Sequence, residues 1–224
     1  LAYRQGGQPG LNFALQAARS LNAELGVKSR LAPGVELTAT LFRSRTRDEV
    51  VAATSSGGRN TFTNADRTQR SGVELSGQAQ LGDALTLAGG YTYTDARFKR
   101  YTTVGGVDLS GKRIPGVPRH SLFAELAWQH APTGLSTALE WRAVSSVFAA
   151  DDNSAAARSY HLVNLRAGWT HRAGDWRLDP YLRIDNLFNR EYVGSVIVNE
   201  ANKRYFEPAP GRQWALGFNA TYRF

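Results

Sequence analysis

The stretch from Gly211 to Phe224 alternates between apolar and small or polar side chains. Every second residue from Trp214 onward is apolar, and this set ends on Phe224, whereas the residues between them are Ala, Gly, Asn, Thr and Arg. A period of two predicts a β-strand with one wholly apolar face. Such a face is buried in the core of a soluble sandwich or faces lipid in a transmembrane β-barrel. The rest of the chain must decide between these two structures.

The same alternation recurs in eight earlier segments, which we expect to be strands. They are joined alternately by turns of about four residues and by polar loops of about ten to twenty, an asymmetry typical of bacterial outer-membrane barrels. The sequence therefore predicts a barrel. The expected earlier strands are 21–31, 35–41, 73–81, 85–94, 122–129, 135–143, 163–170 and 176–185, and the expected loops are about 47–67, 97–117, 147–158 and 190–210.

The charged residues of these segments lie on the face opposite the apolar set. A charge facing lipid at the midplane would cost a few kcal/mol, so this face is expected to line a lumen and to carry ladders of opposite charges. Aromatic residues sort to the strand ends, as expected for two belts at the membrane interfaces. One belt is Trp128, Trp169, Trp176, Tyr222 and Phe224 at the ends joined by short turns; the other is Tyr91, Tyr93 and Trp214.

The composition excludes several classes of protein. No run approaches the eighteen or so apolar residues of a membrane helix, so any spanning segments must be barrel strands. Zero Cys excludes disulfides and cysteine nucleophiles. The basic residues behind the net charge of +8 are scattered, so we expect no nucleic-acid partner. No cluster of His and carboxylates has ligand spacing, so we expect no metal and no cofactor.

Nine strands do not close a bacterial barrel, whose strand number is even and whose edges are not left open in hydrocarbon. We expect residues 1–19 to form an extracellular loop or a frayed extra strand, and residues 20–224 to form the barrel wall. The absence of Met and of a visible signal peptide suggests the downstream part of a longer chain.

One segment near the end resembles a hallmark of TonB-dependent outer-membrane receptors, in which Asp usually occupies the position of Asn189. Its motif residues are Asn186, Leu187, Phe188, Arg190 and Tyr192. Weaker matches occur in the family's order at 24–28, 72–74, 91–96, 114–120 and 222–224. The resemblance implies an all-β, transmembrane antiparallel barrel of 22 strands. This chain would form about the last nine or ten of them, without the plug domain.

The same resemblance implies a receptor in the cell outer membrane of a Gram-negative bacterium. Such a receptor imports a scarce ligand, usually a ferric siderophore or a similar metal chelate, and is energised by TonB through an N-terminal plug region that this sequence does not contain. Other implied partners are outer-membrane lipid, lipopolysaccharide and the barrel-assembly machinery, whose recognition signal the ending with Tyr222 and Phe224 resembles.

Candidate ligand contacts lie in the long loops, because basic and aromatic side chains suit an anionic chelate through charge and stacking. The candidates are Arg97, Lys99, Arg100, Tyr101, Asp151, Asp152, Tyr192, Arg204, Tyr205 and Phe206. The sequence does not name the ligand among siderophores, haem, cobalamin and other complexes that such barrels take up.

Two other functions stay open. A small barrel protease or lipase needs a His with a carboxylate or Ser partner at one rim. His120 and His161 are near the rim that Asp151 and Asp152 could approach, but no spacing joins them, and we expect no enzyme. A passive porin needs a closed, unplugged and water-filled barrel.

Overall fold

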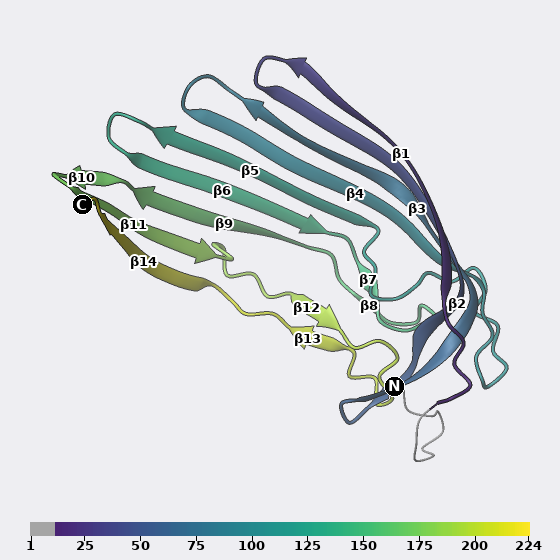
Figure 1. The fold of residues 1–224 in the computed structure, drawn as a ribbon. Helices are drawn as coiled ribbons and strands as arrows, with labels where there is room; N and C mark the ends of the chain where they lie inside the picture. The colour runs from purple at the N-terminus through teal and green to yellow at the C-terminus, as the bar shows by residue number, and fades with distance from the viewer. Residues whose placement is uncertain (1–11) are drawn as a thin grey trace.

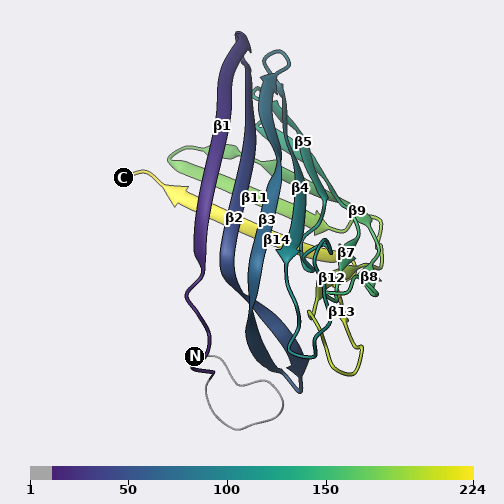
Figure 2. The same cartoon turned by 90° about the vertical axis from the view of Figure 1, so that its right-hand side faces the viewer.

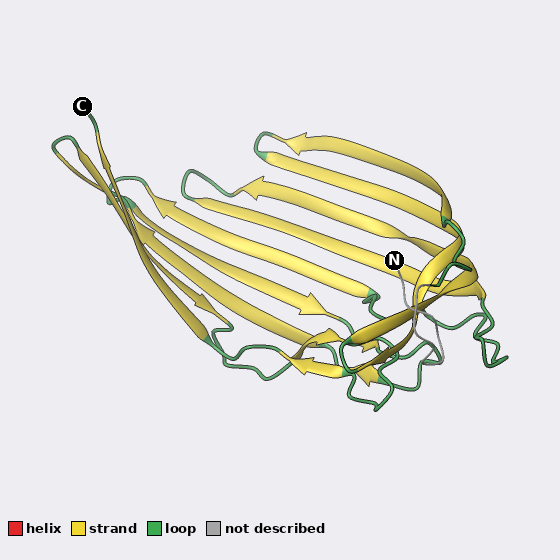
Figure 3. Cartoon of the chain, turned by 60° about the horizontal axis from the view of Figure 1, so that its bottom comes forward, coloured by secondary structure: helices red, strands yellow, loops and turns green. Residues whose placement is uncertain are grey.

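The computed structural model describes residues 12–224, which form one curved antiparallel sheet without helices (Figures 1 and 3). Its nine long strands lie in chain order, as the alternation predicts. They are β1 (Arg19–Ala32), β2 (Val35–Ser56), β3 (Arg59–Gln80), β4 (Leu85–Arg100), β5 (His120–His130), β6 (Leu135–Val144), β9 (Tyr160–Trp169), β11 (Trp176–Asp185) and β14 (Gln213–Tyr222).

Five short strands complete the sheet and the loops. β10 (His171–Ala173) prolongs β9 along the same edge of β11. Two small hairpins lie within the long loops: β7 (Val147–Phe148) with β8 (Ala156–Ala157), and β12 (Val193–Val196) with β13 (Phe206–Pro208). No helix among residues 12–224 is long and apolar enough to cross a membrane.

The sheet has a turn end and a loop end. Four tight turns lie together at one end and the long loops gather at the other (Figure 1). Each tight turn contains a glycine with positive φ, and Gly134 (φ +74) is the most constrained of them. A Cβ at this position would lie 2.1 Å from the Thr170 carbonyl oxygen, so the turn after β5 accepts only glycine.

The long loop expected at about 47–67 does not exist, and this prediction is wrong. β2 and β3 continue as a paired hairpin to a turn at Gly57 and Gly58, with a break in regular geometry at Asp48 (φ +54). β4 likewise continues to Arg100, inside the loop expected at 97–117. Above a membrane both faces of a hairpin are wet, so these extensions lack the apolar alternation that marks the strands below.

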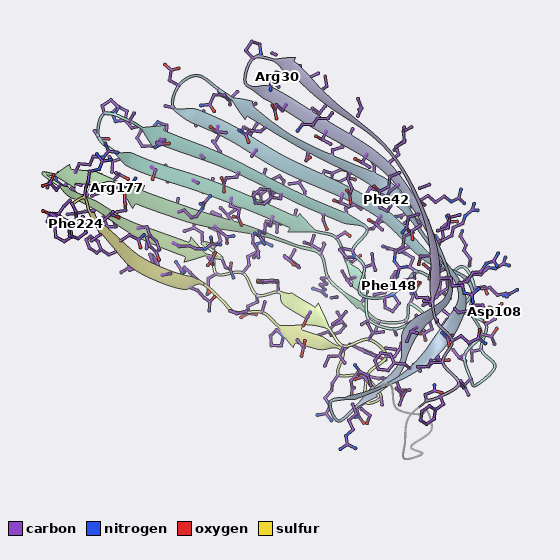
Figure 4. All side chains as sticks on the ribbon, in the orientation of Figure 1. Arg30, Phe42, Asp108, Phe148, Arg177 and Phe224 are labelled. Atoms are coloured by element: carbon purple, nitrogen blue, oxygen red, sulfur yellow. The ribbon has the colours of Figure 1, made fainter. Side chains whose placement is uncertain are left out.

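The polar face carries the charge ladders that the sequence predicts. Three ion pairs join residues two apart on one strand: Glu140 with Arg142, Asp179 with Arg177, and Asp185 with Arg183. Two more join different strands: Arg30 on β1 pairs with Glu36 on β2, and Arg166 on β9 reaches across β6 to Glu125 on β5. Arg30 and Arg177 are labelled in Figure 4. Most of these side chains are half-exposed, so the ladders satisfy charge along a wet surface rather than supply much stability.

The apolar face is exposed along its length. On β14, Leu216 is 83% exposed and Trp214 62%. Aromatic rings gather at the turn end, where Trp176 lies 5.0 Å from Tyr222, and Tyr222 lies 5.2 Å from Phe224, between ring centroids. A continuous exposed apolar face bounded by aromatic rings is suited to lipid.

The sheet is strongly curved but open. In the side view, β11 and β14 pass behind β1 to β4 (Figure 2). Among the described residues β1 pairs only with β2, and β14 pairs only with β11. Residues 12–18 contain a turn and no strand. The extra strand or loop expected at 1–19 otherwise lies outside the described residues and stays a prediction.

Candidate ligand-binding mouth

The loops at the loop end pack over a small apolar core. Phe98 and Tyr101 form its centre, with ring centroids 4.8 Å apart and exposures of 0% and 2%. Ala65, Ala96, Leu109 and Ile114 surround them. The sequence suggested Tyr101 as a ligand contact, and this structure does not offer it as one, because its ring is buried between the β3–β4 extension and the loop that follows.

Asn199 joins three segments that are far apart in the sequence. Its Nδ2 donates to the Ala52 carbonyl (2.7 Å) and to Asp151 Oδ2 (2.9 Å), and its Oδ1 accepts from the Asp151 amide (3.0 Å). The backbone N–H of Asn199 donates to the Ala149 carbonyl, and its backbone carbonyl accepts from the Ser55 N–H. One asparagine thereby ties the β2–β3 tip to the loops after β6 and β11.

Asn153 makes a second joint between loops. Its Nδ2 donates to the Arg113 carbonyl, and its Oδ1 accepts from the Arg113 amide, both at 2.8 Å. Asn153 and Asn199 both have positive φ, at +62 and +54, a conformation that Asn tolerates better than most residues. The mouth is therefore a cross-linked structure rather than a set of independent loops.

Asp151 is buried at this junction, with 5% of its surface exposed. Burial raises the pKa of its carboxyl to about 6, and the hydrogen bonds with Asn199 and Tyr101 offset only part of this effect. Asp151 is thus a packing residue here, and the ligand contact that the sequence suggested is not available. Its neighbour Asp152 is exposed and accepts from the amide and hydroxyl of Ser154 in a local turn.

Loop packing at Asp151 should weaken as the pH rises from about 4 to above 6. The folded-state pKa lies above its ordinary value, so the protonated form stabilises the packed loop, and this contribution is lost through pH 6. A shift of this size corresponds to about 1–3 kcal/mol. Hydrogen exchange in residues 147–158, corrected for intrinsic rates, should show more protection at pH 5 than at pH 7. Asp151→Asn should remove the difference, and equal protection in the wild type would contradict the assignment.

The motif that begins at Asn186 builds a tight turn at the end of β11. Asn186 (φ +53) is buried, and its side chain exchanges hydrogen bonds of 2.8 Å with the amide and carbonyl of Arg190. The backbone N–H of Asn186 donates to Asn164 Oδ1 on β9. Asn189 Oδ1 accepts from the Arg212 amide at 2.8 Å, and so holds the start of β14. Phe188 is 70% exposed and Leu187 is half-buried.

An aromatic hollow of about 530 Å³ opens beside this turn. Tyr160 and Tyr192 form one wall, with ring centroids 4.5 Å apart, and Phe206 lies on the hairpin β12–β13 opposite. Arg158 and Arg190 add two positive charges to the lining and Glu191 adds one negative charge, so its net charge is positive. A second hollow of about 420 Å³ shares Arg158, Tyr160 and Val193 with the first. Of the residues suggested by the sequence, the structure brings Tyr192 and Phe206 together here.

The remaining candidates lie apart from this hollow. Arg97 pairs with Asp95 and donates to the Gly111 carbonyl, and Arg100 pairs with Asp66. The Arg204 amide donates to Glu200, while Tyr205 meets Phe206 edge-on at 6.0 Å. Lys99 is exposed on β4. In residues 12–224 no group of His and carboxylates is placed to hold a metal ion.

Comparison with known proteins decides the family. The family described as TonB dependent receptor-like, beta-barrel, matches residues 2–187. The chain belongs to the TonB-dependent receptor family. Its strands are therefore transmembrane strands of an outer-membrane barrel of a Gram-negative bacterium, the turn end is periplasmic, and the loop end is extracellular.

Several relatives of this receptor barrel carry siderophore names. It is 33% identical over 128 residues to the ferrichrome outer membrane transporter/phage receptor of Escherichia coli K12, over 55% of this chain and 16% of that protein. It is 26% identical over 233 residues to the catecholate siderophore receptor Fiu of the same strain, over 95% of this chain and 29% of that protein. The structure of BauA, the ferric preacinetobactin receptor of Acinetobacter baumannii, superposes with a TM-score of 0.72 at 21% identity, over 90% of this chain and 29% of that one. The chain spans less than a third of the length of these relatives.

Sequence reasoning missed three residues that shape the mouth: Arg158, Tyr160 and Asn199. Tyr160 is the first residue of β9, and the alternation predicts the face of a strand residue but not its contacts in the loops. Asn199 adopts a positive φ, which its residue type allows but does not reveal. A search for Asn in long polar loops could have flagged it.

Proposed function

We propose that the receptor containing this barrel wall imports a ferric siderophore across the outer membrane and is energised by TonB. The family and the names of the relatives support import of an iron chelate. Within this chain the proposal rests on the hollow formed by Tyr160, Tyr192 and Phe206 with Arg158 and Arg190. Aromatic rings stack on flat, unsaturated ligand groups, and guanidinium groups neutralise an anionic complex.

The arrangement favours a catecholate-type or carboxylate-type chelate. Both arginines belong to the extracellular mouth, where an anionic complex first meets the receptor, and neither forms an ion pair within residues 12–224. The hollow lies among the extracellular loops, so the ligand would be captured here before it moves inward. Release into the periplasm would then require force on a plug, which TonB supplies in this proposal.

Uptake of an iron-55-labelled triscatecholate siderophore by cells that carry the full-length receptor tests this assignment. Arg158→Ala and Tyr192→Ala should each lower uptake at limiting ligand by about tenfold, because each removes a charge or a stacking surface worth about 1–2 kcal/mol. Tyr192→Phe should retain most uptake. Arg59→Ala, on the exposed β2–β3 turn, is the matched control for Arg158→Ala and should have no effect.

A proton uncoupler separates energised import from passive passage. Uptake should stop with the uncoupler, whereas a porin would continue to conduct. Unchanged uptake in Arg158→Ala and Tyr192→Ala would refute the proposed site, and uptake that resists the uncoupler would refute the proposed mechanism.

No observation favours a barrel protease or lipase. His120 Nδ1 is 2.8 Å from the Tyr91 hydroxyl at the outer rim. Asp151, which the sequence suggested as a carboxylate that could approach His120 or His161, is instead held by Asn199. The structure therefore leaves both histidines without this partner.

A further inference from the structure

The second hollow at the mouth differs from the aromatic hollow in its lining. Its volume is about 420 Å³, and it shares Ala157, Arg158, Tyr160 and Val193 with the aromatic hollow. The rest of its lining is uncharged and consists of three serines, three valines, two glycines and a proline. We call this second hollow the serine chamber. The two cavities meet at Arg158 and Tyr160, so one ligand can occupy both.

Three neighbouring strands form the floor of the serine chamber. Ser121 on β5 pairs with Val144 on β6, and Val144 pairs with Tyr160 on β9. Residues that lie opposite each other in an antiparallel sheet point to the same face. The adjacent row contains Leu122 and Ala143, which belong to the apolar face, so the floor residues point into the lumen. The chamber therefore lies on the side of the wall along which an imported ligand moves.

Ser145 gives the chamber one directed hydrogen-bond donor. Its Oγ accepts from the backbone N–H groups of Arg119 at 2.9 Å and His120 at 3.0 Å. A serine hydroxyl has two acceptor positions and one proton, so both acceptor positions are occupied. Among residues 12–224 the proton of Ser145 is donated to no acceptor. The hydroxyl of Ser195, by contrast, donates to Glu207. Ser145 is thus able to donate to a ligand in the chamber.

The two cavities suit different chemical groups. The aromatic hollow has stacking rings and a net positive charge, which suit a flat anionic group. The serine chamber offers valine side chains and one neutral donor, which suit carbon atoms and a carbonyl oxygen. A charged group would lose its water there, and its one opposite charge, Arg158, is shared with the anionic group next door. An uncharged chain that contains amide groups meets these requirements.

We propose that this site binds a chelate of two parts, with an anionic iron-binding unit in the aromatic hollow and an uncharged, amide-bearing arm in the serine chamber. This inference rests on the proposed function, and it narrows the substrate class to chelates that carry such an arm. Ser145 donates to a carbonyl oxygen of the arm, and Val144 and Val147 contact its carbon atoms. A compact chelate fills the aromatic hollow alone and is a poorer substrate.

Uptake of two synthetic iron-55 complexes by cells that carry the full-length receptor tests the arm assignment. Both are ferric triscatecholates of equal charge, and one of them carries a capped glycylglycine arm. At limiting concentration, wild type should take up the arm-bearing complex at least about tenfold faster than the arm-free complex, because the arm is buried and hydrogen-bonded.

Ser145→Ala should lower uptake of the arm-bearing complex about fivefold and leave uptake of the arm-free complex unchanged. A merely structural change in the loop would lower both. Ser146→Ala is the matched control, since Ser146 is exposed and lines neither cavity, and it should behave as wild type. Ser121→Phe fills the chamber and should abolish the preference for the arm-bearing complex, with the arm-free complex as its internal control.

The arm assignment and the proposed function fail in different ways. Equal uptake of the two complexes by wild type, or equal losses of both in Ser145→Ala, would overturn the arm assignment. Arg158→Ala tests the aromatic hollow separately, because it should lower uptake of the arm-free complex. If it does not, the proposed function of the hollow fails and the arm assignment fails with it. Wild-type cells that import neither complex would refute both.

Discussion

Gly72→Ala should prevent assembly of the barrel. Gly72 lies on β3, opposite Phe42 on β2 and Thr94 on β4. A Cβ at this position would lie 1.9 Å from the Tyr93 carbonyl oxygen and 2.7 Å from Cζ of Phe42. The ring of Phe42, labelled in Figure 4, can turn aside, but the Tyr93 carbonyl belongs to the β3–β4 pairing. Relieving the clash means breaking that pairing, at a cost of about 3 kcal/mol or more.

The measurement is the yield of folded full-length receptor, detected as heat-modifiable mobility in outer-membrane fractions. Gly90→Ala is the matched control, because it makes the same change inside the neighbouring strand β4. There the nearest atom to the added Cβ is the Leu75 carbonyl oxygen at 3.7 Å, an ordinary contact. Gly90→Ala should therefore assemble normally. Normal yield of Gly72→Ala would show that β3 and β4 can separate at this point without loss.

The lipid-embedded part of this fold is predictable because its two faces contact different solvents. Lipid on one face and a wet lumen on the other impose a period of two, so the alternation in strands such as β2 and β14 is visible without any structure. Beyond the membrane that constraint ends. The hairpin from Glu49 to Ala65 is paired along its length with one irregularity between Ala52 and Thr54, yet its sequence resembles a polar loop, because water covers both of its faces.

The mouth was only partly predictable for a different reason. Residue type identified Tyr101 and Tyr192 as equal candidates, but contacts between distant loops bury the first and place the second in an open hollow. A basic hollow formed by β2, β3 and β4 shows the same limit. Its arginines are scattered along the sequence, and only the register between strands brings Arg45, Arg67 and Lys99 around one hollow.

Asn199→Ala should release the loops of the mouth from one another. The substitution removes two donated hydrogen bonds, to the Ala52 carbonyl and Asp151, and the one accepted from the Asp151 amide. Each buried partner left without a hydrogen bond costs about 1–3 kcal/mol. Alanine also tolerates the φ of +54 less well than asparagine does. Hydrogen exchange in the full-length receptor should accelerate in residues 147–158 and at the tip of β2–β3, while the transmembrane strands keep their protection.

Two comparisons separate the causes. Asn199→Gly accepts the positive φ without strain, so the protection that both variants lose measures the contribution of the side-chain hydrogen bonds. Any further loss in Asn199→Ala measures the backbone strain of alanine at this φ. Asn202→Ala is the matched control, because the side chain of Asn202 is exposed and, within residues 12–224, bonds only to Glu200 in the same turn. It should leave exchange at 147–158 unchanged. Wild-type protection in Asn199→Ala would mean that the apolar core around Phe98 and the backbone hydrogen bonds of residue 199 to Ala149 and Ser55 are enough to hold the three segments together. In that case siderophore uptake should not depend on Asn199. If Asn199 instead positions the aromatic hollow, uptake by Asn199→Ala should fall together with its protection from hydrogen exchange.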